Sequence, residues 1–447
     1  MIHLYRFKDL NIVLDIGSGA VHAVSDAVFD ILSCRNNQVD EKKYSPEIVR
    51  EAKKEIEELF AAGMLDSPDT PADEASPERR GAVIKAMCLH AAHDCNMRCE
   101  YCFADTGGFR GKRALLPLET GKRAIDFLLK ESGNRINLEV DFFGGEPLMN
   151  YGVIKELVLY GREQEKGYGK NIRFTLTTNG LLLDDEKTEF INEYMDNVIL
   201  SIDGRPEVND RMRKTVSGEG AYDHIAGKLV RFAEARKRNR ANPLYYVRGT
   251  YTAFNKDFSK DVLHLANLGF KNISLEPAVT SGEEPWALTE ADLPELFAEY
   301  DRLTDLVLDR EEKGDPISFF HFKVDLDQGP CVFKRASGCG AGTEYIAVTP
   351  EGDIYPCHQF AGDTDYRLGN VYDERFENRL ADVFRRAHIY SKEDCRSCWA
   401  KYYCSGGCHA AALQTNGDLM KPRRLSCELE KKRLECAIGL AAKRVNY

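Results

Sequence analysis

Short apolar runs alternate with stretches of helical periodicity through the middle of the chain. Six of these runs are predicted strands, and they cover residues 84–90, 140–143, 173–180, 198–204, 245–251 and 272–275. Residues 222–238 and 257–268, which lie between the later runs, have apolar positions at the spacing of amphipathic helices. This alternation predicts an α/β fold with a parallel sheet.

The amino-terminal segment has a different pattern. Residues 4–14 and 20–24 are predicted strands with a Gly-Ser-Gly turn at 17–19, and two helices are expected after them. The second helix is expected to follow the N-cap Ser45. Its apolar residues share one face: Ile48, Ala52, Ile56, Leu59 and Phe60. The Pro-, Asp- and Glu-rich residues 66–81 predict a linker, so this segment is expected to be a separate, winged-helix-like module.

Composition limits the classes of function. A chain of 447 residues predicts two to four domains, and a net charge of −11 argues against nucleic acid as a partner. The chain has neither an apolar run long enough to span a membrane nor a signal-peptide layout, which predicts a cytoplasmic protein without a membrane partner. In that reducing compartment, the 14 cysteines are expected to be metal ligands or catalytic groups rather than disulfides.

A close triplet of cysteines follows the first of the six predicted strands. Its members are Cys95, Cys99 and Cys102. Three thiolates leave one iron of a four-iron cluster without a protein ligand, and an iron with an open site can bind and reduce a substrate. The alternative is a zinc knuckle, which would need a fourth ligand; His90 and His93 lie close by.

This spacing resembles the CxxxCxφC signature of the radical S-adenosylmethionine (SAM) superfamily, with Tyr101 at the aromatic position φ. The resemblance implies SAM as cofactor, a first [4Fe-4S] cluster, and a partial (β/α)6 TIM-like barrel. A second motif resembles the family's GGEP, which meets the amino group of SAM: Gly144, Gly145, Glu146 and Pro147. Glycines let the backbone approach a ligand, and a carboxylate accepts hydrogen bonds from an ammonium. The alternative is an ordinary Gly-Gly turn with a solvated Glu.

Polar residues at the ends of the next two strands fit the same site. By resemblance, the SAM contacts are Thr177, Asn179, Ser201, Asp203 and Arg213. Barrel active sites gather at the carboxyl ends of the strands, and an Arg pairs well with a carboxylate. The alternatives are ordinary turns at Asn-Gly and Asp-Gly and a solvated Arg. Glu276, which follows the sixth strand, either faces the reacting centre or is a capping or solvated group.

The remaining clustered cysteines lie in the carboxy-terminal third, and their spacing resembles the SPASM extension, which houses two auxiliary [4Fe-4S] clusters. By resemblance, the ligands of the first are Cys339, Cys357, Cys408 and Cys331. Those of the second are Cys395, Cys398, Cys404 and Cys427. If Cys331 is not a ligand, the first auxiliary cluster has an open iron that can take a substrate thiolate. A pair of zinc sites is the alternative.

The order of segments resembles the thioether-forming maturases that act on the six-cysteine peptide SCIFF. It implies a leader-recognition domain at residues 1–75, a radical SAM barrel at 76–325 and a SPASM domain at 326–447. The implied partners are a leader-bearing, cysteine-rich precursor peptide, bound by strand addition, and a flavodoxin- or ferredoxin-like reductant. Sulfatase-type Cys or Ser oxidation, epimerisation and carbon–carbon crosslinking remain alternative reactions. An iron–sulfur carrier without a substrate is the non-enzyme alternative.

Overall fold

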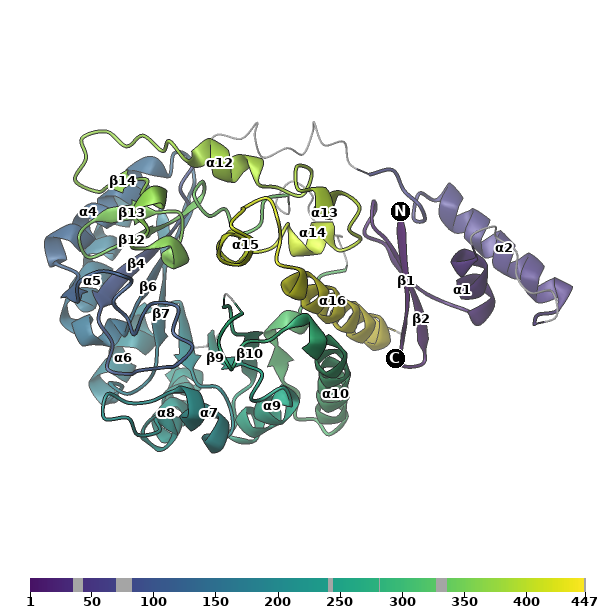
Figure 1. The fold of residues 1–447 in the computed structure, drawn as a ribbon, viewed down its shortest axis with the longest axis horizontal. Helices are drawn as coiled ribbons and strands as arrows, with labels where there is room; N and C mark the ends of the chain where they lie inside the picture. Colours follow the sequence, from purple (N-terminus) through teal and green to yellow (C-terminus); the bar gives the residue numbers. More distant parts are fainter. Residues whose placement is uncertain (35–42, 70–82, 240–243, 281, 327–335, 446–447) are drawn as a thin grey trace.

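The computed structural model describes residues 1–34, 43–69, 83–239, 244–280, 282–326 and 336–445. Its centre is a row of six parallel strands, each hydrogen-bonded to the next one along the chain (Figure 1). These strands are β4 (Ala86–His93), β6 (Asn137–Gly144), β7 (Asn171–Thr178), β8 (Asn197–Ser201), β9 (Tyr245–Tyr251) and β10 (Asn272–Pro277). The partial (β/α)6 barrel expected from the sequence is confirmed.

Helices follow the strands and cover the outer face of the sheet. They are α4 (Leu118–Glu131), α5 (Tyr151–Tyr168), α6 (Asp185–Tyr194), α7 (Pro206–Met212), α8 (Tyr222–Asn239), α9 (Phe258–Asn267) and α10 (Leu293–Glu312). Along β6 and β7, alternate residues such as Phe142 and Phe174 are fully buried in the core, and the residues between them are only partly buried or exposed. This period of two places one set of side chains against the helices and leaves the other set for the lumen.

The carboxy-terminal part extends the same sheet. Its strands are β12 (Tyr345–Val348), β13 (Asp353–Tyr355) and β14 (Gly369–Asn370), and its helices are α12 (Ala381–Arg386), α13 (Glu393–Arg396), α14 (Lys401–Cys404), α15 (His409–Asn416) and α16 (Arg424–Val445). Strand β12 pairs in parallel with β4, while the short β11 (Ser318–Phe319) pairs with β10 and β5 (Ala114–Leu115) with β4. Both edges of the six-stranded row are therefore covered by other strands.

The amino-terminal segment forms a three-stranded antiparallel sheet of β1 (Ile2–Phe7), β2 (Leu10–Asp15) and β3 (Val21–Val24), followed by helices α1 (Asp26–Ser33) and α2 (Pro46–Ala61). The strand predicted over residues 4–14 is wrong as one element, because a tight turn at Lys8, whose φ is 52°, folds it into a hairpin. Ser45 caps α2 as predicted, its hydroxyl accepting from the Ile48 N–H. The predicted apolar face of α2 is only partly buried: Ala52 is covered, whereas Ile48 and Phe60 are 45% and 60% exposed.

This amino-terminal sheet rests on helix α16, which lies between it and the barrel in Figure 1. A Cβ on Gly439 of α16 would lie 2.2 Å from the ring of Phe7, so glycine permits the close contact. The His3 ring stacks on Trp399 with centroids 3.8 Å apart, and Lys401 and Tyr402 both bind the carboxylate of Asp69. The amino-terminal module and the cysteine-rich segment are thus packed together.

Three predictions fall outside the described residues: most of the linker, the boundary at 75/76 and the role of Cys331.

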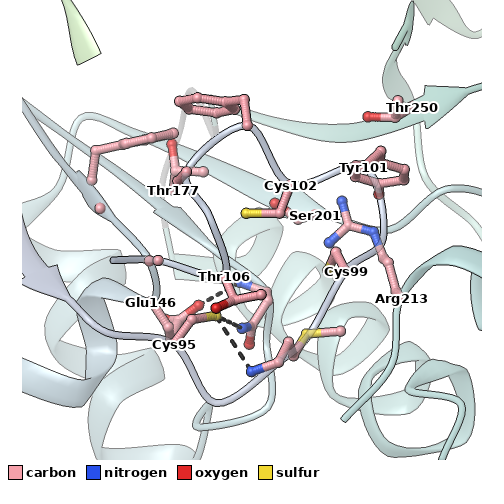
Figure 2. A pocket seen from close by; sticks show the side chains of 18 of the residues that line it. Cys95, Cys99, Tyr101, Cys102, Thr106, Glu146, Thr177, Ser201, Arg213 and Thr250 are labelled. Atoms are coloured by element: carbon pink, nitrogen blue, oxygen red, sulfur yellow. Dashed lines mark hydrogen bonds between the residues drawn. The ribbon is translucent and has the colours of Figure 1, made fainter. Parts of the chain in front are cut away.

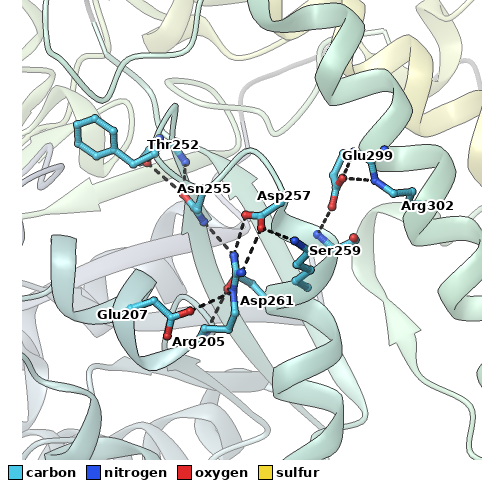
Figure 3. Close-up of polar contacts among 11 residues, drawn as sticks. Arg205, Glu207, Thr252, Asn255, Asp257, Ser259, Asp261, Glu299 and Arg302 are labelled. Carbon is cyan, nitrogen blue, oxygen red and sulfur yellow. Dashed lines mark hydrogen bonds and ion pairs between the residues drawn. The ribbon is translucent and has the colours of Figure 1, made fainter.

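A buried polar network fixes the turn after β8 (Figure 3). The Arg205 guanidinium donates to Asp261 (2.8 Å) and Asp257 (2.7 Å), and Asn255 also donates to Asp261 (3.2 Å). A side chain at Gly204 would collide with Asp261, because a Cβ there would lie 2.3 Å away. The network therefore ties the end of β8 to the start of α9.

Among the described helices, none is both long and apolar enough to cross a membrane.

Candidate active site

The three clustered cysteines follow β4 in a loop that borders a cavity at the carboxyl ends of the strands (Figure 2). The loop is fixed by backbone hydrogen bonds from the Arg98 N–H to Lys214 O (2.7 Å) and from the Glu100 N–H to Met212 O (2.9 Å). The sulfur of Cys95 accepts from the Met97 N–H (3.4 Å). All three cysteines line the cavity: Cys95, Cys99 and Cys102.

Gly144 and Gly145 bring the end of β6 into direct contact with this loop. The N–H of Gly145 donates to Ala92 O (2.8 Å), and the N–H of Glu146 donates to Asp94 O (2.9 Å). A Cβ at Gly144, whose φ is +127°, would lie 2.2 Å from Ala92 O, and one at Gly145 would lie 2.1 Å from Asp94 O. Only glycine fits at both positions, so the alternative of an ordinary exposed turn does not describe them.

Glu146 is buried and borders the cavity, rather than solvated as the alternative required. Its carboxylate accepts from the Thr178 hydroxyl (2.8 Å) and from the N–H groups of Asn179 (2.8 Å) and Leu148 (3.0 Å). Burial raises the pKa of Glu146 to about 7, against these hydrogen bonds. The Glu146 carboxylate therefore holds the end of β7 in place. Hydrogen bonds within the protein already occupy part of its capacity to accept further ones.

The residues expected to contact SAM divide into two groups. Four of them line the same cavity as the cysteines: Thr177, Asn179, Ser201 and Arg213. Asp203 is buried behind that wall, where it accepts from the Tyr101 hydroxyl (2.6 Å) and the Thr250 N–H (2.9 Å) and pairs with the Arg213 Nε (3.1 Å). The structure thus places Asp203 where it orients Arg213.

The cavity is also lined by residues that the sequence motifs did not indicate. They are Phe103, Phe143, Arg248, Thr250, His358 and Gln359. Glu276 also lies here, facing the cavity, which was one of its two expected placements. Arg248 and Thr250 share the inward face of β9, so strand alternation was the one signal that could have pointed to Arg248. His358 and Gln359 follow Cys357, so the cysteine-rich segment supplies part of the cavity lining.

A second cavity, of about 380 Å³, lies in the carboxy-terminal part. Four cysteines line it: Cys395, Cys398, Cys404 and Cys427. Burial raises the pKa of Cys395 to about 11 and that of Cys404 to about 12. These thiols need metal charge to become thiolates, which is the usual coupling between metal binding and proton release.

Three further cysteines lie close enough together to affect one another's charge. They are Cys339, Cys357 and Cys408. Burial raises the pKa of Cys357 to about 12, and the neighbouring sulfurs of Cys408 and Cys339 add to that rise. The fourth expected ligand, Cys331, lies outside the described residues.

The donor sets fit iron–sulfur clusters better than single ions. A zinc site draws its ligands to about 2.3 Å from one centre. Within the described residues, no group of three or more His, Cys, Asp or Glu is arranged to hold one metal ion. Instead, cysteines surround spaces: three at the first cavity, beside the glycine cradle, and four at the second. His90 and His93 do not provide a zinc knuckle, because they bond to each other (2.8 Å) and pack against Phe109.

Comparison with known protein families agrees with iron–sulfur clusters at these cysteines. Residues 90–226 match the radical SAM superfamily, and residues 339–399 match SPASM, described as an iron–sulfur cluster-binding domain. The radical SAM cyclopropyl synthase TigE of Paramaledivibacter caminithermalis is 24% identical over 78% of this chain and 73% of its own length. The cysteine-type anaerobic sulfatase-maturating enzyme of Clostridium perfringens is 27% identical over 73% of this chain and 88% of its own. The subtilosin biosynthesis protein AlbA of Bacillus subtilis is 23% identical over 74% and 69%.

Two solved structures have similar folds. The protein anSMEcpe with bound SAM superposes with a TM-score of 0.64 at 21% identity, covering 81% of this chain and all of its own. Streptococcus suis SuiB bound to its precursor peptide SuiA superposes with a TM-score of 0.57 at 16% identity, covering 95% of this chain and 98% of its own.

The cysteine triplet and the glycine cradle at the mouth of the partial (β/α)6 barrel lie within residues 90–226, so this part of the chain is a radical SAM domain. Residues 339–399 of the cysteine-rich extension, which shares the barrel's sheet, are a SPASM domain.

Proposed function

We propose that this chain oxidatively crosslinks a ribosomally made, cysteine-rich peptide of the SCIFF kind, joining a cysteine sulfur to the α-carbon of an acceptor residue. One observation supports this most directly. His358 and Gln359 line the cavity of the cysteine triplet and follow Cys357, an expected ligand of the first auxiliary cluster. An oxidative bond formation needs an electron acceptor near the reacting carbon, and a cluster held by Cys357 would supply one next to this cavity.

The reaction removes two hydrogens from the peptide. The α-hydrogen leaves as an atom, the thiol hydrogen leaves as a proton, and one electron remains when the carbon–sulfur bond forms. When bound, the first cluster and SAM supply a carbon radical that takes the hydrogen atom, and an auxiliary cluster accepts the electron.

The chain's own residues hold and orient the reactants. Arg213 pairs with the SAM carboxylate, and Glu146 with the strand-end backbone takes hydrogen bonds of its ammonium. Thr177, Asn179 and Ser201 contact the rest of the cofactor. Asp203 fixes the guanidinium of Arg213 from behind. Further along the cavity, Phe103 and Phe143 exclude water from the reacting centre.

The amino-terminal sheet is the proposed leader-binding site. It has two edge strands, β1 and β3, which can accept a further strand. The segment after α2 lies beside β3, because His22 Nε2 on β3 is 2.9 Å from Met64 O. Two apolar side chains of α2, Ile48 and Phe60, and nearby Met64 are exposed. They offer an apolar surface for apolar leader side chains, and SuiB, solved with its precursor peptide, superposes over most of this chain.

The domain division at 75/76 and 325/326 follows from this proposal. Residues 1–75 choose the peptide, 76–325 bind SAM, and 326–447 bind two auxiliary clusters, with Cys331 completing the first. Three clusters in total require a low-potential electron donor of flavodoxin or ferredoxin type. Oxygen-sensitive clusters of this kind favour a reducing compartment, which is the cytoplasm.

Anaerobic incubation with SAM, a reductant and a leader-bearing, cysteine-rich peptide tests the proposal. Loss of two hydrogens from the peptide together with 5′-deoxyadenosine is the expected result. Formation of 5′-deoxyadenosine with unchanged peptide mass would contradict crosslinking and point to epimerisation or another substrate. A protein that binds clusters but forms no 5′-deoxyadenosine would instead be an iron–sulfur carrier.

Cysteine-type sulfatase maturation is the second candidate, favoured by the 27% identity to the Clostridium perfringens enzyme. It predicts that a leaderless sulfatase peptide loses its thiol and gains an aldehyde. The same assay distinguishes the two reactions, because a crosslink retains the sulfur.

A further inference from the structure

One ion pair at the active-site cavity has no role in the SAM binding, water exclusion or leader binding proposed above. Arg248 of β9 and Glu276 of β10 lie on neighbouring parallel strands, and the register pairs Arg248 with Ser274 and Glu276 with Thr250. Their side chains meet at 2.9 Å, from Nη2 to Oε1. Both residues line the same cavity as the cysteine triplet.

The pair is open to the cavity, unlike the ion pair of Arg205 with Asp261 at the end of β8. The Arg248 side chain is 52% exposed and that of Glu276 is 35% exposed. By contrast, Asp261, which binds Arg205, is fully buried. Arginine has five N–H donors, and the single contact of Arg248 with Glu276 leaves several for another acceptor.

Aromatic and apolar residues line the cavity around the pair. Phe143 and His358 have ring centroids 5.0 Å apart, Phe103 lies 5.5 Å from His358, and the segment Pro277 to Val279 lines the same space. Behind the pair, burial lowers the pKa of His321 to about 3, so its imidazole, 3.9 Å from Glu276, is uncharged. Asp141 lies near Arg248, and burial raises its pKa to about 7.

A donor and an acceptor held side by side match a particular ligand chemistry. A carboxylate would be repelled by Glu276, and an ammonium would be repelled by Arg248. The N–H and C=O of one residue in an extended peptide point to the same side of the chain, so they offer a C=O for the guanidinium and an N–H for the carboxylate. In a cavity with apolar walls, both hydrogen bonds are charge-assisted and poorly screened.

We propose that Arg248 and Glu276 bind the backbone C=O and N–H of one residue of the substrate peptide, at or next to the residue that loses its α-hydrogen. This inference rests on the proposed function. The α-carbon of the bound residue lies between its N–H and its C=O, so fixing both groups sets the direction of the peptide backbone relative to SAM. Arg248 and Glu276 are in this sense substrate-positioning residues, and the backbone-binding site is independent of which side chain the acceptor carries.

Peptide binding to the cluster-loaded enzyme with SAM, without reductant, tests the inference before any chemistry occurs. The probe is a fluorescent core peptide without its leader, so that leader contacts do not mask the effect. Arg248→Ala is expected to weaken its binding about ten- to hundred-fold, the usual range for a lost hydrogen bond to a charged group. Glu276→Gln keeps an acceptor oxygen and is expected to weaken binding less, and Arg248→Lys is expected to restore part of it.

The matched control is Arg173→Ala. Arg173 also sits on a barrel strand and lies 4.0 Å from a glutamate, Glu139, of the neighbouring strand, but it borders a different cavity. It is expected to bind the core peptide as the wild type does. SAM affinity, measured in parallel, is expected to stay unchanged in all variants.

Three outcomes would overturn the inference. These are absence of core-peptide binding in the wild type, equal binding by Arg248→Ala and Arg173→Ala, or a parallel loss of SAM affinity. Turnover then separates the two proposals. Intact, Arg248-dependent peptide binding without any change in peptide mass would refute crosslinking while leaving the backbone-binding site standing.

Discussion

Gly145→Ala is the sharpest test of the way the barrel positions its first cluster. The added Cβ would lie 2.1 Å from Asp94 O and 3.0 Å from the Cβ of Cys95, whereas ordinary van der Waals contact begins at 3.4 Å. The strand end and the cysteine loop must therefore separate by about 1 Å. Both contacted atoms are backbone or directly attached to it, so no flexible side chain can absorb the shift.

The shift acts on Cys95 and on the SAM cradle together. A displacement of about 1 Å at a reacting centre costs on the order of a hundredfold in rate. We expect Gly145→Ala to form 5′-deoxyadenosine at least about a hundredfold more slowly in the presence of SAM and dithionite, without any peptide. Iron content per chain, measured on the same samples, shows how much of the loss is failure to hold the cluster.

The control is the same substitution at Gly167, near the carboxyl end of α5. Nothing lies within 4 Å of a Cβ there. Alanine in a helix is favoured over glycine by about 1 kcal/mol, so Gly167→Ala is expected to retain activity and gain slight stability. Wild-type rates from Gly145→Ala would refute the reasoning, as would an equal loss from Gly167→Ala.

Cys95→Ala should abolish 5′-deoxyadenosine, whereas Cys404→Ala should retain some SAM cleavage and form little crosslink; equal loss of both activities in both variants would contradict this division. Burial raises the pKa of Asp141 from 3.8 to about 7, so the folded protein keeps a proton that the unfolded chain releases near pH 4. The stability of the folded protein should therefore fall as pH rises through that interval. The denaturation temperature of Asp141→Asn should depend less on pH across the same interval. Tyr101→Phe deletes a buried donor to Asp203 and should cost about 1.5–3 kcal/mol, seen as a lower denaturation temperature; an unchanged temperature would mean that water replaces the hydroxyl.

Local patterns in the sequence were sufficient for the barrel strands and the cysteine motifs. The strands alternate with helices along the chain, and the thiol spacing is set by the metal chemistry. The hairpin at Lys8 was not predictable in the same way, because a residue without turn preference adopts a positive φ there. Its conformation depends on the pairing of the two strands around it.

Placement within the site depended on contacts distant in sequence. Asp203 ends its strand as a ligand-binding residue would, yet Tyr101 and Arg213 occupy its carboxylate from two other segments. Arg248 looks like a solvated charge in the sequence, and only the neighbouring strand shows that it meets Glu276 inside the cavity. The pairing of β12 with β4 joins residues more than two hundred positions apart, which no local pattern records.

The amino-terminal sheet packs on α16 in one position, and this packing fixes the distance from the sheet to the active-site cavity. Because Gly439 lets Phe7 approach the helix closely and His3 stacks on Trp399, a segment held on that sheet starts from a set distance to the cavity. If this sheet binds the leader as proposed, the chain between the bound leader and the reacting residue must be at least long enough to span that gap. Deleting residues from that tether would then keep the original reacting residue from reaching the cavity.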